Sequence, residues 1–159
     1  MNRLMNGRMR VFAMIVVVLA AGSLLLAQDN PFVGTWKLNV AGSKFNPGPA
    51  PQSQTRTWET SGVVMVNSIG ATGKASSYGY TIKGDGKEYP TIGAIPNTAD
   101  TITSKKINAN SYEANFTKAG KHVETTTFTI SNGGKTLTIH AKGVNEKGDF
   151  DNLTVWDKQ

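Results

Sequence analysis

The chain has 159 residues, no cysteine and a formal net charge of +6 at pH 7. The absence of cysteine excludes a disulfide framework, thiol catalysis and lipid attachment through a cysteine. Beyond the N-terminus the lysines are scattered and only Lys105-Lys106 are adjacent, which is typical of a solvated surface, so we expect no nucleic-acid partner.

The first 27 residues have the order of a secretory signal peptide. Arg3, Arg8 and Arg10 precede an unbroken apolar run that ends at Ala27 and is shorter than the about 20 residues of a membrane-spanning helix. We predict cleavage after Ala27 and export to the periplasm or beyond in a bacterium, with no stable membrane insertion afterwards. Because Leu25 is large for its place before the cut, an uncleaved anchor is the alternative. Losing the three arginines lowers the net charge from +6 to +3.

Residues 28–159 form one predicted domain without helical periodicity. Short alternating runs rich in Thr, Val, Ile, Tyr and Phe are separated by Gly, Asn, Asp or Pro, as is typical of strands. These runs predict ten strands: Phe32–Val40, Gln54–Thr60, Val63–Ile69, Ser76–Lys83, Glu88–Ile92, Thr101–Ile107, Ser111–Lys118, Lys121–Ile130, Thr136–Ala141 and Phe150–Trp156. The turns of only a few residues predict an antiparallel meander.

A flat meander of this size would leave two edges of unpaired backbone groups. Closure removes both edges, so we predict an all-β fold made of a single up-and-down antiparallel β-barrel. A two-sheet sandwich is the alternative. The one long connection, Ala41–Gln52, contains Pro47, Pro49 and Pro51, and we expect it to form an extended loop over one end of the barrel.

The first predicted strand has its large residues on one face. Phe32, Gly34, Trp36, Leu38 and Val40 alternate with polar residues and are expected to point inward. Trp36 is large enough to close one end of a narrow barrel, and a glycine on such a face suits a sharp bend or the close approach of another group.

The sequence of this first strand resembles that of a known protein superfamily. The stretch PFVGTWKL at residues 31–38, followed by Ser43-Lys44-Phe45, resembles the first strand of the calycin superfamily, which includes lipocalins and intracellular fatty-acid-binding proteins. The stretch NLTVWDK at residues 152–158 resembles the last strand of the second group. Over residues 29–158 the chain is also similar to small exported bacterial lipocalin-like proteins of unknown function. The resemblance implies a calycin barrel around a small, mostly apolar ligand.

Two departures from the fatty-acid-binding proteins matter. Their helix–turn–helix lid is replaced here by the proline-rich loop, and their Arg-x-Tyr anchor for a ligand carboxylate is replaced by Thr154 and Trp156. Because an unpaired buried carboxylate is costly, we expect a neutral ligand. Arg56, the only arginine after the leader, is the alternative anchor, although we expect it on the surface.

The candidate ligand-binding residues are polar and aromatic side chains that alternate along the strands: Trp36, Arg56, Tyr78, Tyr80, Phe116, Phe128, Thr154 and Trp156. Alternation does not distinguish a hollow barrel that carries a small lipophilic molecule from a packed barrel that acts through its surface. We expect a monomer in either case.

The sequence gives little support for a metal site, haem binding or catalysis. His122 and Glu124 are expected to point the same way from one strand, but further ligands are missing, so we predict no metal site. His140 alternates with Leu137 and Ile139 and is expected to face solvent; a haem-binding barrel that uses His140 is a lower alternative. No serine lies on a nucleophile elbow, so we predict neither an enzyme nor a cofactor.

We predict that the exported protein has the intact mass of residues 28–159, because the leader is removed during export. Mass spectrometry of the exported protein measures this directly. Its far-ultraviolet circular dichroism spectrum should show little helix. A mass that retains Met1, or a strong helical signal after cleavage, contradicts the prediction.

Overall fold

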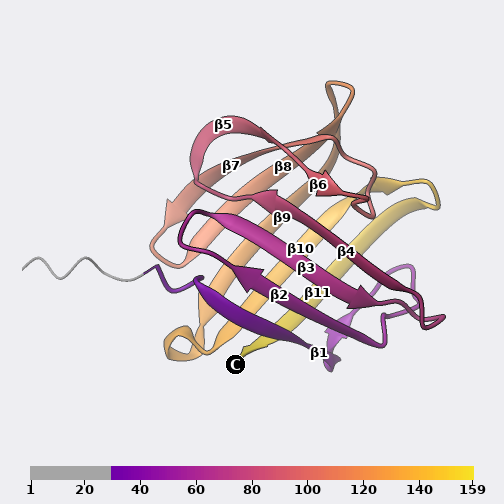
Figure 1. Ribbon diagram of the computed structural model, residues 1–159, viewed down its shortest axis with the longest axis horizontal. Coiled ribbons are helices and arrows are strands. Elements are labelled where there is room, and N and C mark those ends of the chain that lie inside the picture. Colours follow the sequence, from indigo (N-terminus) through magenta and orange to yellow (C-terminus); the bar gives the residue numbers. More distant parts are fainter. Residues whose placement is uncertain (1–29) are drawn as a thin grey trace, which may run out of the picture.

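The computed structural model describes residues 30–159 (Figure 1), so the predicted signal peptide and its cleavage site lie outside the described residues. The described strands are β1 (Gly34–Lys44), β2 (Ser53–Trp58), β3 (Val63–Ile69), β4 (Ala75–Thr81), β5 (Asp85–Pro90), β6 (Ile92–Gly93), β7 (Thr101–Asn108), β8 (Ser111–Lys118), β9 (Lys121–Ser131), β10 (Thr136–Asn145) and β11 (Gly148–Lys158). A 3-10 turn, η1 (Asn132–Gly134), joins β9 to β10. Residues 30–159 contain no helix with the length and hydropathy of a membrane span.

All eleven strands belong to one antiparallel sheet. Its order is β5-β7-β8-β9-β10-β11-β1-β2-β3-β4-β6, so the first strand lies beside the last. The two outer members, β5 and β6, are separated only by Thr91; β5 pairs with β7 and β6 pairs with β4. The sheet thereby curves round into a nearly closed barrel, as Figure 1 shows. The predicted up-and-down barrel is confirmed, and it fits the calycin fold that the sequence resembles.

Several strand boundaries differ from the predicted ones, and residues 41–44, which the sequence predicts as part of the loop Ala41–Gln52, belong to β1. The expected strand Glu88–Ile92 is divided because the backbone N–H of Thr91 donates to the Asp100 carbonyl (2.9 Å), which gives eleven strands instead of ten. The glycine-containing stretch 143–148, which the sequence predicts as a turn, is mostly strand. Only Glu146 and Lys147 form the turn of the β10–β11 hairpin.

The alternation of β1 breaks after Asn39. The register between β1 and β11 shifts between Asn39 and Lys44, where the Asn39 side chain accepts a hydrogen bond from the Gly42 N–H (2.9 Å). The Asn39 carbonyl accepts another from the Ser43 hydroxyl (2.7 Å). These local bonds replace ladder bonds and reset the faces. Val40 is consequently 36% exposed, and the prediction that it points inward is wrong.

The predicted inward position of Trp36 is confirmed. Trp36 and Phe32 are both 0% exposed, and the Trp36 indole N–H donates to the Phe32 carbonyl (2.8 Å). The Phe32 ring packs against Trp58 (centroids 4.8 Å apart) and Tyr112 (4.9 Å), and Trp58 also meets Phe128 at 5.6 Å. We call these five residues the aromatic cluster. The cluster fills one end of the barrel interior.

We predict that Trp36→Ala lowers the free energy of unfolding by about 3–5 kcal/mol, because it empties a large buried volume and removes a buried hydrogen bond. Lys37→Ala, on the exposed side of the same strand, should change it by less than about 0.5 kcal/mol. Urea denaturation followed by circular dichroism compares the two. Equal midpoints would show that Trp36 does not support the core.

Candidate functional site

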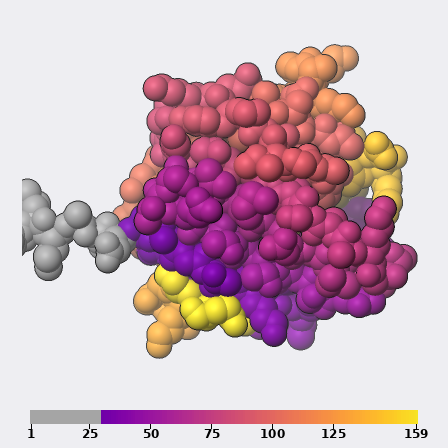
Figure 2. Space-filling model, in the orientation of Figure 1, coloured from indigo at the N-terminus to yellow at the C-terminus, as the bar shows by residue number. Residues whose placement is uncertain are grey.

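The end of the barrel away from the aromatic cluster holds a cavity of about 200 Å³. Strands β2, β4 and β8–β11 provide its wall. Its rim includes Phe45 from the proline-rich loop, residues 95–97 between β6 and β7, and Asn145 at the β10–β11 turn. In Figure 2 this hairpin, in yellow, stands away from the magenta surface and leaves a hollow beside it. The interior is therefore packed with side chains at the end of the aromatic cluster and hollow at the other end, so neither the fully hollow nor the fully packed barrel describes it.

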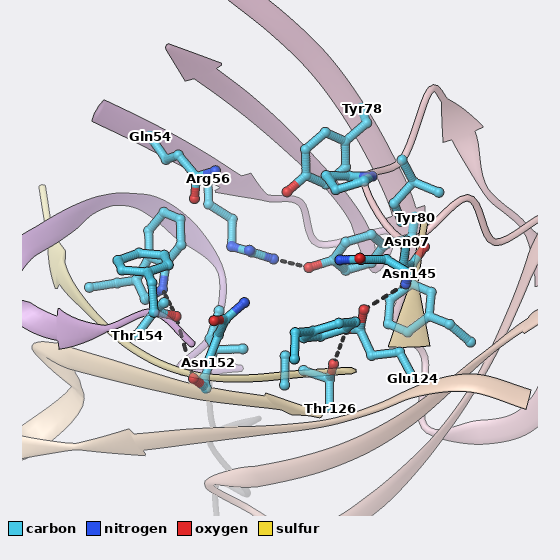
Figure 3. A pocket seen from close by; sticks show the side chains of 18 residues that line it. Gln54, Arg56, Tyr78, Tyr80, Asn97, Glu124, Thr126, Asn145, Asn152 and Thr154 are labelled. Carbon is cyan, nitrogen blue, oxygen red and sulfur yellow. Dashed lines mark hydrogen bonds between the residues drawn. The ribbon is translucent and has the colours of Figure 1, made fainter. Parts of the chain in front are cut away.

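Arg56 on β2 is a charged side chain inside the cavity, and the expectation that it lies on the surface is wrong. It is 6% exposed, because its partners across the sheet, Trp36 on β1 and Val66 on β3, both point inward. Its Nη1 donates to the Tyr80 hydroxyl, and its guanidinium carbon lies 4.7 Å from the centroid of the Trp156 ring (Figure 3). Its Nε has no hydrogen-bond partner among residues 30–159.

Burial determines the electrostatics of Arg56. Desolvation lowers the pKa of Arg56 to about 10, while Tyr78 and Glu124 act in the opposite direction. The guanidinium therefore stays protonated at neutral pH. Burial of a charge is costly, so the cavity wall presents a positive charge that an anionic group on a ligand would offset.

Thr154 and Trp156 on β11 occupy the positions where the resemblance implies an Arg-x-Tyr anchor. The Trp156 indole N–H donates to the Thr154 hydroxyl (2.9 Å), which in turn donates to the Ile139 carbonyl (3.3 Å). Both polar groups thus have partners within the protein. In this barrel β11 supplies an aromatic face, and β2 supplies the cation that lies against it.

Glu124 on β9 is the second charged side chain that lines the cavity. One carboxylate oxygen accepts from the Asn97 amide (2.6 Å), and the other accepts from the Thr126 hydroxyl (Figure 3). Burial raises the pKa of Glu124, although these hydrogen bonds and the charge of Arg56 act against the rise. No salt bridge joins Arg56 to Glu124 in the described part of the chain.

A β-bulge at Val123 turns His122 outward, while Glu124 points inward in plain alternation with Thr126 and Phe128. Phe116 on β8 lies opposite Glu124, but Thr117 lies opposite His122, so Val123 is an extra residue on β9. His122 is exposed on the outside, where its Nε2 lies 2.8 Å from the Thr125 hydroxyl. The expectation that His122 and Glu124 point the same way is therefore wrong.

Gly143 on β10 makes room for this bulge. It pairs with Glu124, and a Cβ at this position would collide with the Val123 carbonyl. The sequence signal for the inward Glu124 is its alternation with Thr126, Phe128 and Ile130, whereas the outward turn of His122 depends on a glycine of the neighbouring strand.

His140 lies on the outer face, as expected. Its Nε2 is 2.7 Å from Asp151 Oδ1, and its side chain is 41% exposed. A haem inside the barrel would therefore find no ligand at this position. Among residues 30–159 no three His, Cys, Asp or Glu side chains group as metal ligands.

Six of the eight predicted ligand-binding residues line the cavity: Arg56, Tyr78, Tyr80, Phe116, Thr154 and Trp156. Trp36 and Phe128 lie in the aromatic cluster instead and do not line it. The polar residues that the sequence reasoning missed are Gln54, Asn97, Glu124, Thr126, Asn145 and Asn152. Asn97 belongs to a turn-like Pro96-Asn97 pair, which in sequence indicates only a loop.

Comparisons with known proteins find similar chains among solved structures. No model of a protein family matches the chain, and no curated protein matches it in sequence. Among solved structures, the zebrafish ileal bile acid-binding protein complexed with cholic acid is similar at 9% identity and a TM-score of 0.46. The match covers 81% of this chain and 99% of that one. A similarity at this level says nothing of what this chain binds.

We predict that Gly143→Ala destabilises the protein by about 1–3 kcal/mol, because the new methyl group collides with the backbone of the β9 bulge. Gly70→Ala is the control, since a Cβ there would lie at an ordinary 3.5 Å from the nearest atom. Urea denaturation of the two variants measures the difference. A Gly143→Ala variant as stable as the control would mean that the bulge does not need this glycine.

Proposed function

We propose that this protein is an exported lipocalin-like binding protein that holds a small, mostly apolar molecule in the barrel, with an acidic group of the ligand at Arg56. The observation that carries this proposal is the buried, protonated guanidinium of Arg56, which lines the cavity and forms no salt bridge within residues 30–159. Export is supported by the leader-like first 27 residues.

The size of the cavity supports a compact ligand. The cavity volume of about 200 Å³ is smaller than the volume of about 300–1,000 Å³ that is typical of sites for drug-sized ligands. The rings of Tyr78, Phe116, Phe150 and Trp156 offer flat apolar surface around it. A short aromatic or branched aliphatic acid suits this space better than a long-chain fatty acid.

The charge of the cavity favours an acid over a neutral molecule. The expectation of a neutral ligand depends on the absence of an inward cation, and the buried Arg56 supplies one. A ligand carboxylate that accepts from the Arg56 guanidinium would offset the buried charge in one contact. The anchor of this barrel would then lie on β2 and not on β11.

We predict that 3-phenylpropionate binds at least tenfold more tightly than its methyl ester, about 1.4 kcal/mol, because only the acid offsets the charge of Arg56. Quenching of tryptophan fluorescence during titration reports binding, since Trp156 lines the cavity. Arg56→Gln should abolish the preference. Lys37→Gln, which removes a positive charge from the outside of β1, should leave it unchanged.

An equal affinity for acid and ester, or a preference that survives in Arg56→Gln, would contradict the role of Arg56. Circular dichroism of each variant shows whether the barrel still folds. If neither compound binds, and native mass spectrometry of the exported protein finds no co-purified small molecule, the alternative of a barrel that acts through its surface is favoured.

A further inference from the structure

Arg56 and Glu124 are the only charged side chains, among residues 30–159, that line the cavity. They come from β2 and β9, which are not neighbours in the sheet, and they reach the same space from different sides (Figure 3). Their charges influence each other without a salt bridge between them. The cavity therefore contains one cation and one carboxyl group that are not joined by a salt bridge.

A bound acid would add a second carboxylate next to the same cation. In a site of low dielectric constant, one cation does not stabilise two carboxylates at once, because the two negative charges repel each other strongly. One of the two carboxyl groups must then become neutral. The ligand would contact Arg56 directly, whereas the hydrogen bonds of Glu124 come from the uncharged Asn97 and Thr126. Glu124 is therefore the group that gives up its charge.

The hydrogen bonds of Glu124 are compatible with both of its charge states. A carboxylate accepts from the Asn97 amide and from the Thr126 hydroxyl. After protonation, the carboxyl O–H donates to the Thr126 oxygen, whose hydroxyl rotates, and the other oxygen still accepts from Asn97. The side chain does not need to move for the proton to bind.

We propose that the cavity takes up its acidic ligand together with one proton from solvent, and that this proton binds Glu124. The inference rests on the proposed function and adds a role for Glu124: it makes affinity for an acid depend on pH. No covalent bond to the ligand forms or breaks, and the complex keeps one cation and one anion in the cavity.

The other groups around Glu124 do not replace it in this role. Tyr78 on β4 has a pKa raised by burial and is neutral near pH 7, and Arg56 stays charged. His122 is exposed on the outside of the same strand. The neighbouring strands β8 and β10 pair with Glu124 through Phe116 and Gly143, which do not titrate.

The direction of the pH dependence follows from linkage. Burial already raises the pKa of Glu124, and a bound anion raises it further. Between the pKa of the free protein and that of the complex, binding takes up a proton, so affinity falls as pH rises through this interval. The fall is at most tenfold per pH unit for one proton.

Isothermal titration calorimetry tests the proposal with 3-phenylpropionate between pH 6 and 9, where the free compound is ionised. Titrations in two buffers of different ionisation enthalpy give the number of protons taken up on binding. We expect up to one proton per ligand in the wild-type chain and none in Glu124→Gln, which should bind with nearly pH-independent affinity. His122→Gln is the matched control and should keep the proton uptake.

The possible outcomes separate a failure of the role of Glu124 from a failure of the proposed function. Binding that depends on Arg56 but takes up no proton at any of these pH values overturns the role of Glu124 and leaves the proposed function standing. Proton uptake that persists in Glu124→Gln places the proton on the ligand and also overturns it. If 3-phenylpropionate does not bind, or binds equally to Arg56→Gln, the proposed function fails and this inference with it. If Glu124→Gln does not fold, a wild-type proton count of zero still overturns the proposal.

Discussion

A β-strand presents successive side chains to opposite faces, and in a closed barrel this constraint decides which residues meet inside. Arg56 is buried because it has the same parity on β2 as Trp58, and because its cross-strand partners Trp36 and Val66 also point inward. The constraint is stronger than the preference of a single guanidinium for water. The site follows from this parity, which also places Glu124 inward with Thr126 and Phe128 on β9.

How far the sequence predicts the structure depends on how local each signal is. The strands and the inward Trp36 are predictable, because alternation and turn residues lie within a few positions of each other. The position of Arg56 is also predictable if parity with Trp58 is given more weight than the hydrophilicity of arginine. The inward Glu124 follows from alternation with Thr126 and Phe128. The outward His122 is not predictable, because the bulge that turns it needs Gly143, which is brought beside Val123 only by strand pairing.

The two halves of the barrel interior differ in how they are packed. In one half, fully buried aromatic side chains fill the space, and this packing is a large source of stability for a chain without disulfides. In the other half, polar side chains are held around a cavity that contains the buried guanidinium of Arg56. A cavity of this kind lowers stability, and the packed half offsets that loss. Such a division is typical of a scaffold that carries a site.

The pairing of β1 with β11 has a consequence for how the chain becomes a barrel. Asn39 on β1 and Asp157 on β11, which form a hydrogen bond, are 118 positions apart. A chain that emerges with its N-terminus first keeps one side of β1 without a partner until its final residues are available. Contacts between such distant positions slow folding. The pair of strands that closes the barrel therefore forms late in folding.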